Sequence, residues 1–140
     1  MAPTEVFLDA SYAIALAVPS DRMHDRAMVV AAELRGQVTR IVTTRAVLLE
    51  IGNFLAKRRY RSAASRILLQ AEMDRTLDIL PLSDDLYARA LALYRMHDDK
   101  EWGLTDCVSF VVMRERGLTH ALTADEHFRQ AGFVPMLAGG

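Results

Sequence analysis

Three aspartates stand where a folded chain can bring side chains together. Asp9 comes directly after the apolar run Val6-Phe7-Leu8, and Asp125 follows the run Ala121-Leu122-Thr123 by two residues. The carboxyl ends of parallel strands meet at one edge of an open sheet, and ligands bind there. Asp106 falls in the first turn of an expected helix, where the helix dipole stabilises a carboxylate by ~0.3–1 kcal/mol. The spacing therefore predicts that these acids share one edge of a sheet.

Glu50 is a fourth candidate, because it lies inside an amphipathic helix expected over residues 46–59. At ~100° per residue it falls about 40° from Phe54 and about 60° from Val47, on the border of the apolar arc. A charged side chain at that border is expected to be half-buried, which is unfavourable unless the charge has a function. Each acid also has an ordinary interpretation, as a helix cap, a turn residue or a solvated edge residue, and these stay open for each acid taken singly. Together they are called the four acids below: Asp9, Glu50, Asp106 and Asp125.

A cluster of carboxylates has a definite chemistry. Two carboxylates ~4 Å apart repel by about 4 kcal/mol at an effective dielectric near 20, so a cluster holds protons or binds a cation. Hard ions such as Mg²⁺ prefer carboxylate oxygens, and the chain lacks the His–Cys set that suits zinc. A bound Mg²⁺ activates water and neutralises the charge that develops on a phosphodiester. The four acids thus predict a divalent-cation site.

Strands alternate with helices along the chain, which is typical of an α/β protein with a mainly parallel sheet covered on both faces. Gly36 and Gly117 stand where helices should stop. The apolar runs predict strands at 6–8, 40–44, 77–82, 119–123 and 133–137. The helical periodicity predicts helices from 11 to 16, from 20 or 21 to 34, and over 46–59, 62–75, 83–94, 105–116 and 124–131, with Thr105 as the cap of the sixth helix.

The length of 140 residues predicts one domain over 1–140. The 17 Lys and Arg residues balance 18 Asp and Glu residues, so a charged partner must be recognised by a local patch. The longest uncharged stretch, Ala10–Ser20, is shorter than a bilayer span. The first apolar stretch has no basic region before it and is interrupted by acids, which argues against a secretory signal and favours a cytoplasmic protein.

Four stretches of the sequence resemble the PIN domain, in particular the VapC-type ribonuclease toxins of bacterial toxin–antitoxin pairs. The resemblance follows one order over nearly the whole chain, and the stretches that carry it are Phe7–Ser11, Thr43–Asn53, Asp99–Phe110 and Ala121–Phe128, with Gly132-Phe133 after them. Any one of these motifs is weak on its own. Four in order within 140 residues are specific.

The resemblance implies a PIN-like fold, with a central sheet of about five strands flanked by helices on both faces. It implies a Mg²⁺-dependent or Mn²⁺-dependent endoribonuclease whose catalytic and metal-binding residues are the four acids. Ser11, Asn53 and Thr123 would support them by hydrogen bonds. Similar toxins form homodimers and are inhibited by a cognate antitoxin protein, so RNA, an antitoxin and a second copy of the chain are the expected partners.

One basic stretch follows the helix that carries Glu50: Lys57, Arg58, Arg59 and Arg61, with Tyr60 among them. These cations can bind RNA phosphates while Tyr60 stacks on a base. They can equally complement the helix dipole and stay solvated.

Two single residues are expected to have a packing role and not a chemical one. Cys107, the one cysteine, has apolar neighbours, and Trp102 is expected to anchor its loop by packing. The four histidines are scattered without ligand spacing and are not expected to be catalytic.

Two other functions are compatible with parts of the pattern. A non-catalytic PIN-fold module that binds RNA or protein would keep the fold without cleaving, and tight metal-independent RNA binding would reveal it. A phosphorylated receiver domain also places an aspartate at a strand end. That class is disfavoured, because the chain has no adjacent acidic pair early and no lysine after a late strand.

Overall fold

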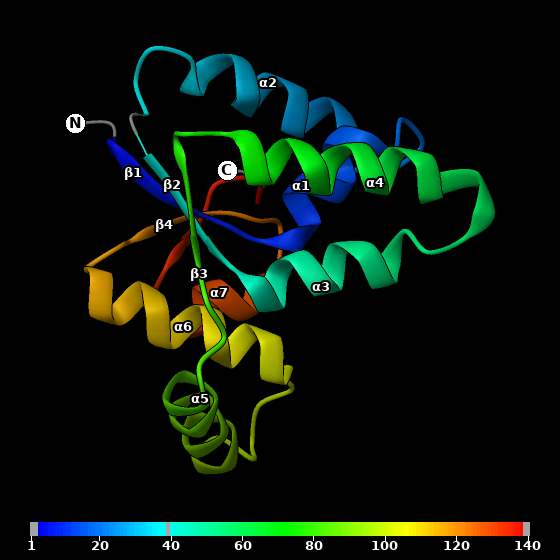
Figure 1. Ribbon diagram of the computed structural model, residues 1–140. Coiled ribbons are helices and arrows are strands. Elements are labelled where there is room, and N and C mark those ends of the chain that lie inside the picture. Colours follow the sequence, from blue (N-terminus) through cyan, green and yellow to red (C-terminus); the bar gives the residue numbers. More distant parts are fainter. Residues whose placement is uncertain (1–2, 39, 139–140) are drawn as a thin grey trace.

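The structure, a computed structural model, describes residues 3–38 and 40–138. Within these residues the chain forms five strands and seven helices in alternation (Figure 1). The strands are β1 (Glu5–Leu8), β2 (Arg40–Thr44), β3 (Leu77–Leu80), β4 (His120–Leu122) and β5 (Val134–Pro135). The helices are α1 (Ala10–Ala17), α2 (His24–Leu34), α3 (Arg45–Phe54), α4 (Arg58–Met73), α5 (Asp84–Met96), α6 (Leu104–Arg116) and α7 (Glu126–Gln130).

The strands form one sheet in the order β3-β2-β1-β4-β5, and every pair is parallel. The chain first builds outward from β1 through β2 to β3, then returns to place β4 on the other side of β1. The strand order therefore reverses between β1 and β4. Their register pairs Phe7 with Ala121 and Leu8 with Leu122. In open α/β sheets this reversal point is where ligands bind, outside the carboxyl ends of the strands.

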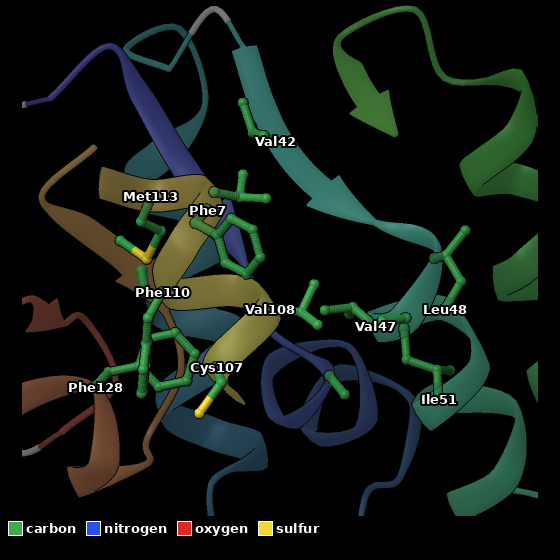
Figure 2. Packing of buried hydrophobic residues seen from close by; sticks show 14 of the residues in the cluster. Phe7, Val42, Val47, Leu48, Ile51, Cys107, Val108, Phe110, Met113 and Phe128 are labelled. Carbon is green, nitrogen blue, oxygen red and sulfur yellow. The ribbon is translucent and has the colours of Figure 1, made fainter. Parts of the chain in front are cut away.

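Both faces of the sheet are covered, as the alternation of elements predicted. Val6 and Phe7 are fully buried on opposite faces, because successive strand residues point in opposite directions. Val6 packs with α2, which lies on one side of the sheet, while α5 and α6 lie on the other (Figure 1). On that second side Phe7 packs near Phe110 and Phe128, whose rings meet edge to face at 5.0 Å (Figure 2).

The two helices predicted over 46–59 and 62–75 are both present, but the break between them comes earlier in the chain than expected. α3 ends at Phe54, α4 begins at Arg58, and Leu55 between them is fully buried. The two helices lie side by side, run in opposite directions and project from one end of the molecule (Figure 1). The sequence pattern places this break a few residues too late, because residues 55–57 contain no Gly or Pro.

Other helix ends also differ by a few residues. The second helix begins at His24 rather than at 20 or 21, and α6 is capped by Gly103 rather than by Thr105. The predicted stops are confirmed: Gly36 and Gly117 follow α2 and α6 with φ of +79° and +67°, a left-handed conformation that favours glycine.

Two predicted packing residues are confirmed. Cys107 is fully buried, and burial raises the pKa of its thiol to about 11, so it stays protonated in the core (Figure 2). Trp102 is also buried, and its indole Nε1 donates a 3.0 Å hydrogen bond to Gln130 Oε1. Among the helices of the described part of the chain, none has the length and hydropathy to cross a membrane.

Candidate functional site

Asp9 lies at the reversal point of the sheet. It follows β1 directly and is the N-cap residue of α1, and its backbone N–H donates to Leu122 O of β4 at 3.3 Å. The parallel register of β1 and β4 thus continues one residue past the strand ends. As a result Asp9 is brought beside Thr123, although 114 residues separate them in the sequence.

Two hydroxyl groups hold the Asp9 carboxylate. Thr123 Oγ1 donates to Asp9 Oδ2 at 2.7 Å, and Ser11 Oγ donates to the same oxygen at 2.9 Å. Thr123 Oγ1 also accepts from the backbone N–H of Asp125 at 3.0 Å. The Thr123 hydroxyl therefore connects two of the four acids. Ser11 and Thr123 thus both contact Asp9, and the supporting role in the reaction that the sequence resemblance implied for them stays a prediction.

Asp106 lies in the first turn of α6. The backbone N–H of Gly103 donates to Asp106 Oδ2 at 3.0 Å, which ties the carboxylate to the start of its own helix. A Cβ built on Gly103 would lie 3.7 Å from that oxygen, so a small side chain would fit there. Asp106 is therefore both a helix-capping residue, as its ordinary interpretation held, and a side chain of the site.

Asp125 caps α7, the short helix after β4. Its Oδ1 accepts from the backbone N–H of His127 at 2.9 Å. The His127 ring then lies between two acids, with Nδ1 at 3.3 Å from Asp125 Oδ1 and 3.2 Å from Asp106 Oδ2. Within the described residues, Asp106, Asp125 and His127 form a group whose potential ligand atoms lie within 4.8 Å of one another.

Glu50 reaches the site from α3. It is half-buried, as its place at the border of the apolar arc predicted, and it accepts a hydrogen bond from the Thr105 side chain. Thr105 therefore interacts with Glu50 across the gap between α3 and α6 instead of capping its own helix. The contact is one that spacing along the chain did not suggest.

The four acids line one open pocket of about 690 Å³. They come from the end of β1, from α3, from the start of α6 and from the turn after β4. An apolar groove of about 400 Å³ lies elsewhere, between α1 and α4, and contains none of them. The acids are not equally close: the tight group of Asp106 and Asp125 includes His127 but neither Asp9 nor Glu50.

Uncompensated negative charge is the main electrostatic property of this pocket. Burial raises the pKa of Asp9 from 3.8 to about 6, against the opposing effect of the hydrogen bonds from Thr123 and Ser11. Burial, followed by repulsion from Asp9 and Asp106, raises the pKa of Glu50 from 4.5 to about 7. The pKa of Asp106 is also raised, chiefly by burial. Carboxyl groups in this state gain from a cation that neutralises them.

Other predicted residues lie outside the pocket. Asn53 is exposed in a neighbouring hollow that it shares with Glu50 and Thr105, and no hydrogen bond of its side chain is found among the described residues. Its supporting role stays a prediction. The basic residues Lys57, Arg58, Arg59 and Arg61 are exposed at the start of α4 and at the turn before it, and none lines the pocket.

Tyr60, predicted to stack on a base, is less available than the sequence suggested. Its ring packs against the core cluster, and Arg59 Cζ lies 4.7 Å from the ring centroid. Arg61 Nε donates to the backbone oxygen of Ala56 at 3.2 Å. Binding of RNA by this stretch also stays a prediction.

Three groups at the pocket were not among the predicted site residues. His127 was set aside with the other histidines, although its place two residues after Asp125, at the start of a helix, was a usable signal. Arg22 and Phe54 also line the pocket. Arg22 lies in a loop that carries no motif. The apolar periodicity predicts Phe54 as a core position of α3, but the structure leaves 66% of it exposed.

The fold and the pocket define an α/β protein with a carboxylate site at the reversal point of a parallel sheet. The chain belongs to the PIN domain family, whose model matches residues 6–134. It is homologous to the "23S rRNA-specific endonuclease VapC20" of Mycobacterium tuberculosis, strains CDC 1551 / Oshkosh and H37Rv. Each match is 28% identical over 130 residues, covering 92% of this chain and 95% of the relative.

A solved structure gives the same relationship in three dimensions. The crystal structure of M. tuberculosis VapC20, described as a "Sarcin-Ricin loop cleaving toxin", superposes with a TM-score of 0.84 at 28% identity, covering 92% of this chain and 96% of that one. The predicted PIN-like fold is thereby confirmed, with the refinement that all sheet pairs are parallel. Homology to an endonuclease toxin supports nuclease activity for this chain.

Proposed function

We propose that this protein is a metal-dependent endoribonuclease that hydrolyses RNA phosphodiester bonds at the four acids. One observation carries the proposal: four carboxylates from four separate elements line one pocket at the reversal point of the sheet. Helix capping explains Asp106 and Asp125 singly but not the gathering of all four, because the acids raise the cost of ionising one another. The endonuclease relatives support a nuclease in particular.

The donor set fits a hard divalent ion. Asp9, Glu50, Asp106 and Asp125 offer carboxylate oxygens, which suit Mg²⁺, and Mn²⁺ also accepts a nitrogen ligand such as the nearby imidazole of His127. A bound ion would supply charge neutralisation at the phosphate and a water of lowered pKa. Among the described residues neither Asp9 nor Glu50 forms an ion pair, and burial raises the pKa of both.

The chain's own residues orient this donor set. Ser11 and Thr123 fix one oxygen of Asp9, and the Gly103 N–H fixes one oxygen of Asp106. Because these partners are the buried Thr123, the half-buried Ser11 and a backbone N–H, the carboxylates are ordered before any ligand arrives, which is the preorganisation that catalysis requires. Glu50, with a pKa of about 7 in the metal-free protein, is suited to hold or release a proton near neutrality.

The relatives suggest the biological setting. VapC20 is named as an endonuclease specific for 23S rRNA, so ribosomal RNA is the first substrate to test here. We propose that this chain is likewise the toxin of a type II pair, that a cognate antitoxin inhibits it and that it acts as a homodimer. An adjacent reading frame for a small protein would support the antitoxin.

The decisive experiment is cleavage of a labelled ribosomal RNA fragment with Mg²⁺ and with EDTA. We expect cleavage by the wild type with Mg²⁺ and none with EDTA. Asp9→Asn and Asp106→Asn should each lose at least 100-fold in rate, a typical loss for a single electrostatic group of an active site. Asp98→Asn changes an exposed aspartate outside the pocket and should cleave like the wild type.

Two outcomes would contradict the proposal. Cleavage that survives EDTA and both substitutions would place the chemistry elsewhere. Tight RNA binding with no metal-dependent cleavage would favour the non-catalytic PIN-fold module instead.

A further inference from the structure

Arg22 and Phe54 are the two side chains of the pocket that suit a polynucleotide better than a metal ion. The pocket is lined by six acidic residues, and Arg22 is the one basic residue among the described residues that line it. Phe54 is a large aromatic residue left 66% exposed at the same pocket. Neither residue contributes to the core, and neither is needed to hold a cation.

The loop that carries Arg22 is ordered by its own backbone. Asp21 N–H donates to Val18 O at 2.9 Å, and His24 N–H donates to Asp21 O at 2.9 Å. Asp21 Oδ1 accepts from the N–H of Met23 at 2.8 Å, so the Asp21 side chain is engaged within the loop. The Arg22 side chain is exposed and has no hydrogen bond or ion pair among the described residues. The loop therefore presents an unpaired guanidinium beside the four acids.

Phe54 does not belong to the buried face of its helix, α3. The buried face of α3 is formed by Val47, Leu48 and Ile51, and Leu55 continues it just after the helix. Phe54 lies one helical turn after Glu50, so the two side chains are neighbours on the helix surface. Phe54 and Glu50 also line the hollow of about 530 Å³ beside the pocket, which Asn53 lines as well. An exposed aromatic ring next to a proposed reacting group is available for contact with a ligand.

We propose that Arg22 binds a phosphate of the RNA strand and that Phe54 stacks on an unpaired base of the same strand, so that the two residues position the strand over the four acids. The inference rests on the proposed function. Six acids repel a phosphate backbone, and a guanidinium at the pocket offsets part of that repulsion and can bind a phosphate in bidentate fashion. Stacking requires a base free of its duplex, which favours a single-stranded or looped segment.

Measurements of RNA binding and of RNA cleavage should separate the phosphate contact of Arg22 from the base stacking of Phe54. Affinity is measured by fluorescence anisotropy with a labelled single-stranded RNA of about 12 nucleotides, in the Asp106→Asn background with Mg²⁺ so that the strand stays intact. We expect Arg22→Ala to raise Kd about tenfold and to reduce the slope of log Kd against log salt by about 0.7, the value for one phosphate contact on a single strand. We expect Phe54→Ala to raise Kd about tenfold and to leave that slope unchanged.

The conservative variants test the chemistry of each contact. Phe54→Tyr keeps a stacking face and should bind like the parent protein, whereas Phe54→Leu keeps apolar area without the face and should bind like Phe54→Ala. In the otherwise wild-type enzyme, Arg22→Ala and Phe54→Ala should raise KM for cleavage more than they lower kcat. The matched controls are Arg35→Ala, an exposed arginine at the far end of α2, and Tyr87→Ala, an exposed aromatic on α5.

The outcomes distinguish this inference from the proposed function. If the wild type cleaves RNA but Kd, salt slope and KM of both variants equal those of the controls, the positioning roles are refuted and the proposed function stands. If no protein cleaves but both variants weaken RNA binding as stated, the positioning roles stand and the proposed catalysis fails. If the variants bind RNA normally and lose only binding of a partner protein, the patch is a protein-docking surface and the inference is overturned.

Discussion

The hydroxyl of Thr123 donates a 2.7 Å hydrogen bond to the Asp9 carboxylate, and this contact joins the ends of β1 and β4 at the point where the strand order reverses. Thr123 is fully buried and its oxygen also accepts from the N–H of Asp125. We expect Thr123→Val, which keeps the shape, to cost about 1–3 kcal/mol of unfolding free energy, because it removes one of the two hydroxyl hydrogen bonds to the buried Asp9 carboxylate and leaves the half-buried N–H of Asp125 without its partner. The Tm should fall by several degrees.

A matched control exists on the surface. Thr76 Oγ1 also donates to a carboxylate oxygen, Asp74 Oδ1 at 2.6 Å, but both residues are exposed. Water can replace that bond, so Thr76→Val should change stability by less than about 0.5 kcal/mol. Thermal melting in EDTA checks both variants. Equal losses in the two would show that burial of the Thr123 contact does not matter.

The raised pKa values of Asp9 and Glu50 predict a stability that falls as pH rises in the absence of metal. Both folded pKa values, about 6 and about 7, lie above the ordinary values of 3.8 and 4.5. From about pH 4 to pH 7 the folded chain therefore holds more protons than the unfolded chain, so unfolding becomes easier as pH increases. For the buried Asp9 a rise of about two pKa units corresponds to roughly 2–3 kcal/mol at neutral pH.

Variants isolate this contribution from all other titrating groups. Asp9→Asn and Glu50→Gln cannot ionise, so the Tm of each variant minus that of the wild type, measured in EDTA, should increase between pH 4.5 and pH 8. Asp98→Asn, an exposed control, should give a constant difference. A difference that decreases with pH would mean that the acids have positive partners in the folded protein.

Much of this site was predictable because it depends on strand ends. The apolar runs located β1 and β4, and parallel pairing then required Asp9 and Asp125 to meet at one edge. The half-buried Glu50 followed from its angle on the helix, since that angle is a local property of the sequence. Features fixed by periodicity and by strand pairing were therefore accessible without a structure.

What escaped prediction depends on how helices pack. A helical wheel places Phe54 about 40° from Glu50, but where the core ends on that wheel is decided by the helices against which α3 packs. His127 meets Asp106 only because α7 and α6 lie together, which no spacing along the chain reports. The exact position of the break after α3 also escaped prediction, because the buried Leu55 at that break is not a helix-breaking residue.

Proton release should accompany metal binding. At pH 6.5 the metal-free pocket still holds protons on Glu50 and, in part, on Asp9, and a divalent ion that binds their carboxylates must displace them. Titration calorimetry with Mg²⁺ in two buffers of different ionisation enthalpy measures the number released. We expect a clear release at pH 6.5 and almost none at pH 8.5. Equal release at both pH values would mean that the ion binds away from these carboxylates.

His127 should tune this binding in a way that depends on pH. Its hydrogen bond and its charge both lower the pKa of Asp106, against the larger effect of burial. Without the imidazole that pKa rises further, so the loss of Mg²⁺ affinity in His127→Ala relative to the wild type should be larger at pH 6 than at pH 8. His127→Gln keeps a donor beside Asp106 and should lie between them. Affinity measured by the shift of Tm with Mg²⁺ decides: a deficit of the same size at both pH values would instead identify His127 as a direct ligand of the ion.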